Sequence, residues 1–158
     1  MSSPVRSRAS ARGGRRWTIA EHVTRSEEET EALAAVLGGG FRGGEVVLLT
    51  GELGAGKTAF VRGLARGMGA RPEDVASPTF VLLTVYPGRL ALHHADLYRL
   101  DRGADRELGL EELPGPRGVL AIEWAERLSM LPWPRVHRVS LNHAGDDVRR
   151  IRVEEEAA

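Results

Sequence analysis

The sequence predicts an α/β fold with a mixed sheet that has a parallel centre and antiparallel flanking strands. Two apolar runs, Glu45–Thr50 and Gly118–Ile122, have the length and β-branched character of strands buried on both faces. A glycine-rich turn and then a helical pattern follow the first run, which is the order found in α/β folds. Two further pairs of segments predict flanking hairpins, Phe80–Tyr86 with Arg89–His94, and Arg135–Leu141 with Val148–Glu154.

The remaining segments complete this pattern. Trp17–Val23 predicts a short strand. Ser26 and Glu29 form a capping box before a helix that the glycines at 38–40 end. Further helices are predicted over Thr58–Met68, over the acidic segment Ala104–Leu113, and in a short stretch after Glu123. The whole chain of 158 residues is the size of one domain.

The turn after the first buried strand reads GELGAGKT at residues 51–58 and matches G-x-x-x-x-G-K-[ST] at every fixed position. Its glycines allow successive backbone N–H groups to point at a phosphate, and the following helix adds its positive end. The sequence thus predicts a P-loop NTPase-like three-layer fold that binds ATP or ADP. We expect the nucleotide to contact Glu52, Leu53, Gly54, Ala55, Gly56, Lys57, Thr58 and Ala59.

Lys57 is the single lysine among 22 basic residues, all the others being arginine. A compact ammonium fits among phosphate oxygens where a forked guanidinium does not. The position of this lysine therefore supports a phosphate-binding role, with the hydroxyl of Thr58 as a Mg²⁺ ligand.

Two carboxylates end strands that are expected to lie near this loop. Asp96 ends the segment that begins at Leu90, and Glu123 follows Val119–Ile122 in the manner of a Walker B acid. Ligands of open α/β sheets lie at the carboxyl ends of strands. Both acids are candidates for binding Mg²⁺ and for orienting the attacking water, and the residues alone leave open which does which.

Other side chains are expected to be structural. His93 and His94 are adjacent in a predicted strand and should point to opposite faces, which argues against a zinc site. Trp124 and Trp133 are expected to be packing residues. The chain has no cysteine, which excludes disulfides and thiolate chemistry.

Charge and hydropathy suggest where the protein acts. Residues 1–16 contain five arginines and no acid and predict a disordered tail, whereas residues 17–158 carry 17 basic and 22 acidic residues. An acidic body lacks the basic surface with which a protein binds nucleic acid by itself. No apolar run approaches the roughly 20 residues of a membrane span, so a cytoplasmic location without membrane contact is expected.

Missing motifs narrow the class further. The chain has no N-K-x-D motif for guanine, and it contains no glutamine to position water as in Ras-like or ABC-type proteins. Small-molecule kinases stay possible.

GELGAGKT, SPTF (77–80), HHADLYRL (93–100), LGLEEL (108–113) and IEWAERL (122–128) follow one another as in the TsaE (YjeE) family, which the sequence resembles from about Val23 to its C-terminus. The resemblance implies that residues 17–158 form a P-loop ATPase domain of tRNA threonylcarbamoyladenosine biosynthesis. Hydrolysis would be Mg²⁺-dependent, slow without partners, and would reset a TsaB–TsaD transfer complex that carries the tRNA.

The resemblance also implies residue roles. Lys57 and Thr58 would bind phosphate and Mg²⁺, Asp96 would be an acid beside the metal, and Glu123 would be catalytic or orient water. Thr79 would belong to a switch-like loop near the γ-phosphate. Ala59 stands where many members have a hydroxyl residue, and Ala125 stands where many have proline. We expect these two differences to change affinity without abolishing function.

Two alternatives remain open. A small-molecule kinase would use Arg99, Arg102 or Arg106 as a phosphate clamp and Asp96 as base. A nucleotide-gated binding module would tolerate loss of Asp96 and Glu123 in the cell.

Overall fold

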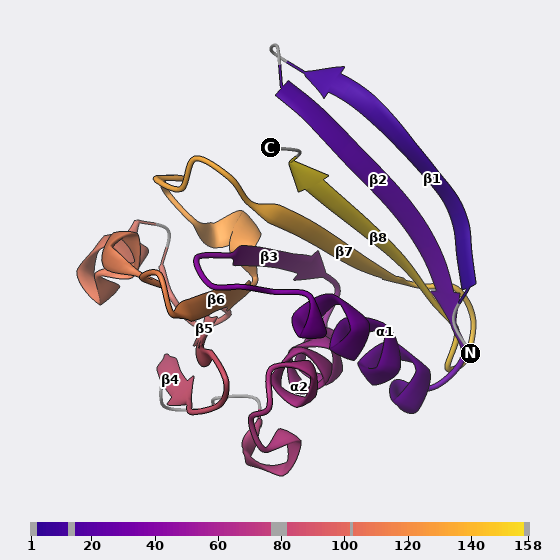
Figure 1. The fold of residues 1–158 in the computed structure, drawn as a ribbon, viewed down its shortest axis with the longest axis horizontal. Coiled ribbons are helices and arrows are strands. Elements are labelled where there is room, and N and C mark those ends of the chain that lie inside the picture. Colours follow the sequence, from indigo (N-terminus) through magenta and orange to yellow (C-terminus); the bar gives the residue numbers. More distant parts are fainter. Residues whose placement is uncertain (1–2, 13–14, 77–81, 102, 157–158) are drawn as a thin grey trace.

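The computed structural model describes residues 3–12, 15–76, 82–101 and 103–156, with side chains from Trp17 onward. Its centre is an eight-stranded mixed sheet with the order β1-β2-β8-β7-β3-β6-β5-β4 (Figure 1). In chain order the strands are β1 (Ser3–Arg12), β2 (Arg15–Thr24), β3 (Val46–Gly51), β4 (Leu83–Tyr86), β5 (Ala91–Asp96), β6 (Gly118–Glu123), β7 (His137–His143) and β8 (Arg149–Glu156).

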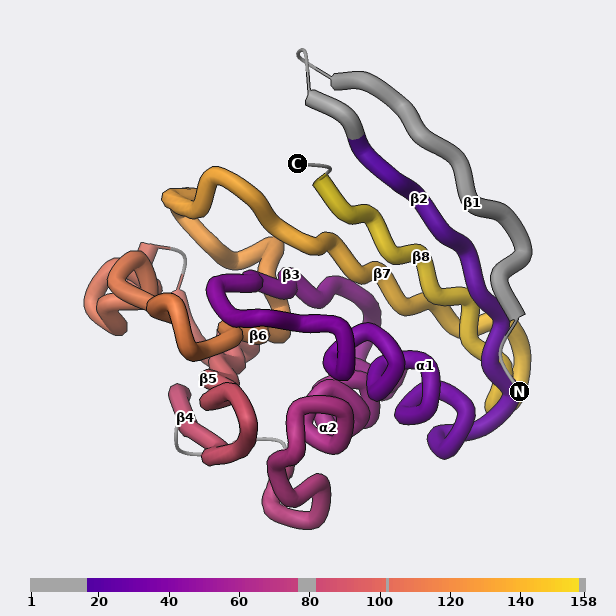
Figure 2. Tube along the Cα trace, in the orientation of Figure 1, coloured from indigo at the N-terminus to yellow at the C-terminus, as the bar shows by residue number. Residues whose placement is uncertain are grey.

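The centre of the sheet is parallel and its flanks are antiparallel, as predicted. Strand β3 pairs in parallel with β6 on one side and with β7 on the other, and β5 continues the parallel set beyond β6. The hairpins β4–β5 and β7–β8 are antiparallel. Strands β2 and β8 run alongside one another at one end of the sheet (Figure 2). Strand β1 pairs with β2 at the edge of the sheet. The carboxyl ends of β3, β5 and β6 therefore lie on the same edge.

Two α-helices, α1 (Glu27–Gly39) and α2 (Lys57–Gly67), pack on one face of this sheet. Ser26 caps α1 by accepting a hydrogen bond from the Glu29 amide at 3.1 Å, so the predicted capping residue is confirmed. The core between helices and sheet consists of buried apolar side chains, among them Phe60, Leu64, Val47, Leu49 and Leu92.

The opposite face is covered by 3-10 turns and loops. The segment that covers this face contains η2 (Ala104–Leu108), η3 (Leu110–Glu112) and η4 (Ala125–Arg127). A separate 3-10 turn, η1 (Pro72–Asp74), follows α2. Apolar side chains of the covering segment pack on Val46, Leu48, Leu120 and Ile122. The third layer is therefore present but contains no α-helix among the described residues.

Two segments that were predicted to be helices form 3-10 turns. The acidic segment 104–113 forms two 3-10 turns, because Gly109 has a left-handed conformation (φ +67°) that interrupts the helical hydrogen bonds. The stretch after Glu123 is a single 3-10 turn.

In the N-terminal segment, Ser3–Arg12 forms strand β1 and pairs antiparallel with β2. The pairing provides hydrogen-bond partners for backbone groups along the outer edge of β2, which would otherwise depend on water. The division of the chain into a tail at residues 1–16 and an ATPase domain at residues 17–158 stays a prediction.

Among the described helices, none is both long and apolar enough to cross a membrane.

Candidate nucleotide site

The glycine-rich loop lies between the end of β3 and the start of α2, as the sequence predicts. Gly51 must be glycine, because a Cβ at this position would stand 2.4 Å from the carbonyl oxygen of Leu141 in β7. Gly56 is the N-cap of α2 and has a left-handed backbone (φ 102°), a conformation that glycine adopts without strain. These two residues turn the chain sharply from the strand into the helix, so that the amino end of α2 faces the edge of the sheet.

Lys57 is buried, with 5% of its surface exposed. Its ammonium donates hydrogen bonds to the carbonyl oxygens of Gly51, at 2.6 Å, and Glu52, at 2.8 Å. Burial lowers the pKa of Lys57 from its usual value, and the nearby carboxylates of Glu123, Glu126, Asp96 and Glu52 oppose that shift. The ammonium thus lies inside the loop, surrounded by acceptors and acids.

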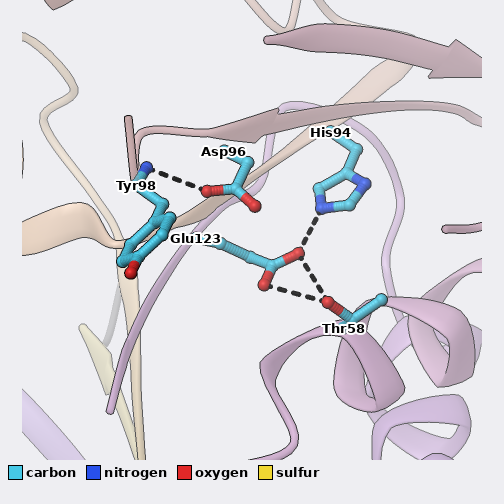
Figure 3. Close-up of polar contacts among 5 residues, drawn as sticks. All are labelled: Thr58, His94, Asp96, Tyr98 and Glu123. Carbon is cyan, nitrogen blue, oxygen red and sulfur yellow. Dashed lines mark hydrogen bonds and ion pairs between the residues drawn. The ribbon is translucent and has the colours of Figure 1, made fainter. Parts of the chain in front are cut away.

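Thr58, Glu123 and His94 form a chain of contacts from the helix to the sheet (Figure 3). The Thr58 hydroxyl lies 3.2 and 3.3 Å from the two carboxylate oxygens of Glu123. Nε2 of His94 lies 2.5 Å from Oε2 of the same carboxylate. Glu123 has 2% of its surface exposed and His94 none. A buried carboxylate at the end of β6 is therefore directed at the first turn of α2.

Asp96 ends β5 and is the register partner of Glu123 in β6. One of its carboxylate oxygens accepts a hydrogen bond of 2.9 Å from the amide of Tyr98 (Figure 3). Burial raises the pKa of Asp96, the Tyr98 amide lowers it, and the proximity of Glu123 raises it further. Two carboxylates from adjacent parallel strands thus lie side by side next to the phosphate loop.

An aromatic pair lies over the same site. The ring centroids of Tyr98 and Trp124 are 4.9 Å apart, and the ammonium of Lys57 lies 4.2 Å from the centroid of the Trp124 ring. Trp124 has a positive φ of 59°, which is unusual for a large side chain. The expectation that Trp124 is only a packing residue is therefore incomplete, since its ring contacts the phosphate-binding lysine.

These side chains surround a cavity of about 260 Å³. It is lined by residues of the loop and α2, by both carboxylates and by the aromatic pair, including Gly54, Gly56, Lys57, Thr58, Asp96, Tyr98, Glu123 and Trp124. A larger hollow of about 720 Å³ lies against β7 and the 3-10 turn after β6, but none of residues 51–58 lines it. The smaller cavity therefore has the chemistry that a polyphosphate needs.

The cavity brings together most of the residues singled out from the sequence. Gly54, Gly56, Lys57, Thr58, Asp96 and Glu123 line it, together with Leu53 and Ala59, whereas Glu52 contributes its carbonyl to Lys57 and Ala55 is buried in the core. The predicted switch residue Thr79 lies outside the described residues.

Sequence reasoning missed three contributors. His94 was considered only as a zinc ligand, and neither Tyr98 nor Arg149 was given a role in the site. The guanidinium of Arg149 reaches the carbonyl oxygen of Gly54 at 3.4 Å. The alternation of His94, Asp96 and Tyr98 along the chain was the available signal for His94 and Tyr98. Within the described part of the chain, no group of three or more His, Asp and Glu side chains is arranged to hold a metal ion by itself.

Comparison with known proteins identifies the family. The family model described as "Threonylcarbamoyl adenosine biosynthesis protein TsaE" matches residues 24–151. The TsaE protein of Treponema pallidum is 46% identical over 133 residues, which cover 83% of this chain and 97% of that protein. The Bacillus subtilis TsaE protein is 40% identical over 130 residues, covering 81% of this chain and 80% of its relative.

A solved structure agrees with these matches. The crystal structure of Bacillus subtilis YdiB superposes with a TM-score of 0.68 at 32% sequence identity, covering 88% of this chain and 86% of that one. The matched region 24–151 contains the phosphate loop, both carboxylates and the aromatic pair described above. The chain therefore belongs to the TsaE family.

Proposed function

We propose that this protein is the Mg²⁺-dependent ATP hydrolase of tRNA threonylcarbamoyladenosine biosynthesis, the process after which its relatives are named. The observation that carries the proposal is the contact between Thr58 and Glu123. A hydroxyl at the start of the phosphate-loop helix, facing an acid at the end of a neighbouring parallel strand, is the arrangement with which P-loop enzymes hold Mg²⁺ beside nucleotide phosphates.

The residues fit such a group. The hydroxyl of Thr58 and the carboxylate of Glu123 supply oxygen ligands, which Mg²⁺ prefers. The two groups are in contact, and both residues line the cavity. Mg²⁺ at nucleotide sites is usually held by one or two carboxylates together with phosphates and water, so a cage made only of protein ligands is not required. When bound, the ion neutralises charge on the phosphate oxygens.

Lys57 would bind the phosphates. Its ammonium now bonds to two carbonyl oxygens of its own loop, which are weaker partners than a phosphate anion. The amino end of α2 and the backbone N–H groups of the loop would complete the anion site. The lowered pKa of Lys57 reflects burial, and a phosphate in the cavity would stabilise its charged form.

Asp96 would orient the attacking water, directly or through the hydration shell of the metal. It lies beside Glu123 but has no contact with Thr58 among the hydrogen bonds of the described residues. Glu123 would thus bind the metal and Asp96 would orient the water, the reverse of what the sequence resemblance implies.

We further propose that hydrolysis is slow in the isolated protein, is stimulated by TsaB and TsaD, and resets their transfer complex. The chain contains no glutamine, so the water-positioning glutamine of other P-loop enzymes has no counterpart in it. A catalytic element supplied by a partner would account for this. Contact with tRNA would then occur through the complex, in keeping with the acidic body of this chain.

ATP hydrolysis by the purified protein, alone and with an active TsaB–TsaD complex, tests the proposal. No other phosphate acceptor should be present. We expect negligible ADP production alone and strong stimulation by the partners. Equal rates with and without active partners would contradict the proposal. In a separate assay with candidate metabolites added, a metabolite that becomes phosphorylated would indicate the kinase alternative instead.

A further inference from the structure

We propose that His94 is a positioning residue, which holds the carboxylate of Glu123 toward the hydroxyl of Thr58 so that the metal side of the site is arranged before Mg²⁺ and nucleotide arrive. The inference rests on the proposed function and adds a residue to it.

The contact geometry carries the argument (Figure 3). Nε2 of His94 and Oε2 of Glu123 are 2.5 Å apart, and both side chains are buried. Because an ionised carboxylate can only accept hydrogen bonds, Nε2–H is the donor. The same carboxylate faces Thr58 at 3.2 and 3.3 Å. Glu123 is therefore bounded on one side by a fixed donor and on the other by the hydroxyl expected to bind the metal.

The second ring nitrogen of His94 supports this assignment. Nδ1 is buried and has no hydrogen-bond partner among the described residues. A hydrogen on Nδ1 would be a buried donor without an acceptor, which is costly, whereas a bare Nδ1 is only an unused acceptor. The tautomer with its hydrogen on Nε2 is therefore favoured, and the whole donor capacity of the ring is directed at Glu123.

The ring itself has little room to move. His94 lies in β5 between β4 and β6, where its register partners are Thr84 and Ala121. The ring of Tyr86 packs against it with centroids 6.1 Å apart. A donor held by the sheet in this way fixes a flexible glutamate side chain, which would otherwise have to be ordered when the metal binds.

A buried histidine that serves only packing would behave differently. Its replacement would lower the stability of the fold without changing how Mg²⁺ affects nucleotide binding. The two readings are therefore separated by metal dependence and not by stability.

Two variants isolate the donor. His94→Gln keeps an N–H donor close to the position of Nε2, whereas His94→Leu has similar bulk and no donor. His93→Leu is the matched control, because His93 is the neighbouring histidine of the same strand and faces the opposite side of the sheet. For each protein, the affinity for ADP is measured by titration calorimetry over a range of Mg²⁺ concentrations, after thermal unfolding has shown that the variant is folded.

We expect His94→Leu to weaken the apparent Mg²⁺ affinity of the ADP complex about 10- to 100-fold, the range found for residues that orient metal ligands. His94→Gln should recover most of that loss, and His93→Leu should resemble the wild type. A His94→Leu protein with the Mg²⁺ dependence of the wild type would overturn the proposal.

A second measurement needs neither nucleotide nor activity. In the ¹⁵N-labelled wild-type protein, the Nε2–H proton of His94 should give a strongly downfield resonance that shifts or disappears in Glu123→Ala. An unchanged resonance would also refute the contact. This result stands even where His94→Leu does not fold or where the wild type proves not to hydrolyse ATP, so failure of the proposed function and failure of the positioning role are distinguishable.

Discussion

At the scale of single residues, the site is built from groups that do not favour folding. Lys57 and Asp96 are both buried, and burial favours the neutral form of each: it lowers the pKa of Lys57 and raises the pKa of Asp96. Such shifts are common where charged groups are held ready for a ligand. Removal of either charge should therefore reduce binding more than it reduces stability.

Lys57→Ala should reduce ATP and ADP affinity by about 100-fold or more while the fold stays intact, because charge-assisted hydrogen bonds to phosphate are among the strongest in proteins. Calorimetric titration with ADP measures the effect. Arg66→Ala, in the same helix but exposed, provides the control and should bind ADP normally. Unchanged affinity in Lys57→Ala would refute the phosphate role of the lysine.

Asp96→Asn should raise the thermal midpoint at pH 7. The pKa of Asp96 is raised in the folded protein above its usual value of 3.8, so the unfolded chain loses its proton first as the pH rises. Folding stability due to this group therefore falls from about pH 3.8 upward until the folded-state pKa is passed, and it stays low at neutral pH. The asparagine variant avoids this loss.

Thermal unfolding at several pH values checks this sign. The advantage of Asp96→Asn over the wild type should shrink as the pH falls toward 3.8. Asp101→Asn, an exposed aspartate nearby, should show little difference at any pH. A lower midpoint for Asp96→Asn at pH 7 would contradict this argument, because it would mean that contacts of the carboxylate stabilise the fold by more than its burial destabilises it.

At the scale of elements, the position of the phosphate loop depends on how closely α1 and α2 approach. A Cβ at Gly67 would stand 2.2 Å from the carbonyl oxygen of Ala35, and one at Gly63 would stand 2.3 Å from that of Glu31. Arg62 and Glu31 add an ion pair of 2.9 Å between the two helices. Glycine at these positions lets α2 lie flat against α1 and directs its amino end at the carboxylates.

Gly67→Ala should destabilise the protein by about 1–3 kcal/mol, the usual cost of overpacking against a backbone that cannot easily move. Gly39→Ala is the matched control, since the new Cβ would meet only the carbonyl oxygen of Gly67 at 3.8 Å. That variant should be neutral or gain up to about 1 kcal/mol from its better helix propensity. Denaturant unfolding of the two variants measures the difference, and equal stabilities would contradict the close-packing argument.

At the scale of the whole molecule, the site draws on three separate parts of the chain that meet at one edge of the sheet. The phosphate loop follows β3, Asp96 ends β5 and Glu123 ends β6, and the parallel pairing of β3, β6 and β5 brings these ends together. The N-terminal strand β1 lies at the far end of the sheet and pairs only with β2. The site should therefore be independent of it.

Deletion of residues 1–14 should leave the fold and ADP binding intact, because the deleted strand is peripheral and the family match begins only at residue 24. Circular dichroism melting and ADP titration of the shortened chain measure this. A loss of cooperative unfolding would show that the domain boundary predicted at residue 17 is wrong. Lower solubility alone would reflect the newly exposed edge of β2.

Features that depend on neighbouring residues could be predicted from the sequence: the buried strands, the capped helix α1, the phosphate loop with its lysine, and the two carboxylates at strand ends. Each of these follows from a local pattern of apolar, glycine and acidic residues. Where a local pattern was ambiguous, prediction failed, as at 104–113, where Gly109 divides an apparent helix into two 3-10 turns.

Which of these groups come into contact depends on the tertiary fold. His94 and Glu123 are 29 residues apart in the chain, and Thr58 and Glu123 are 65 apart, so no local pattern reports their contacts. The register of β5 against β6 and the approach of α2 to the sheet place them within hydrogen-bonding distance. Chemistry that arises from such long-range contacts is invisible in sequence because it depends on packing, whereas the residue types that perform it are already present in the chain.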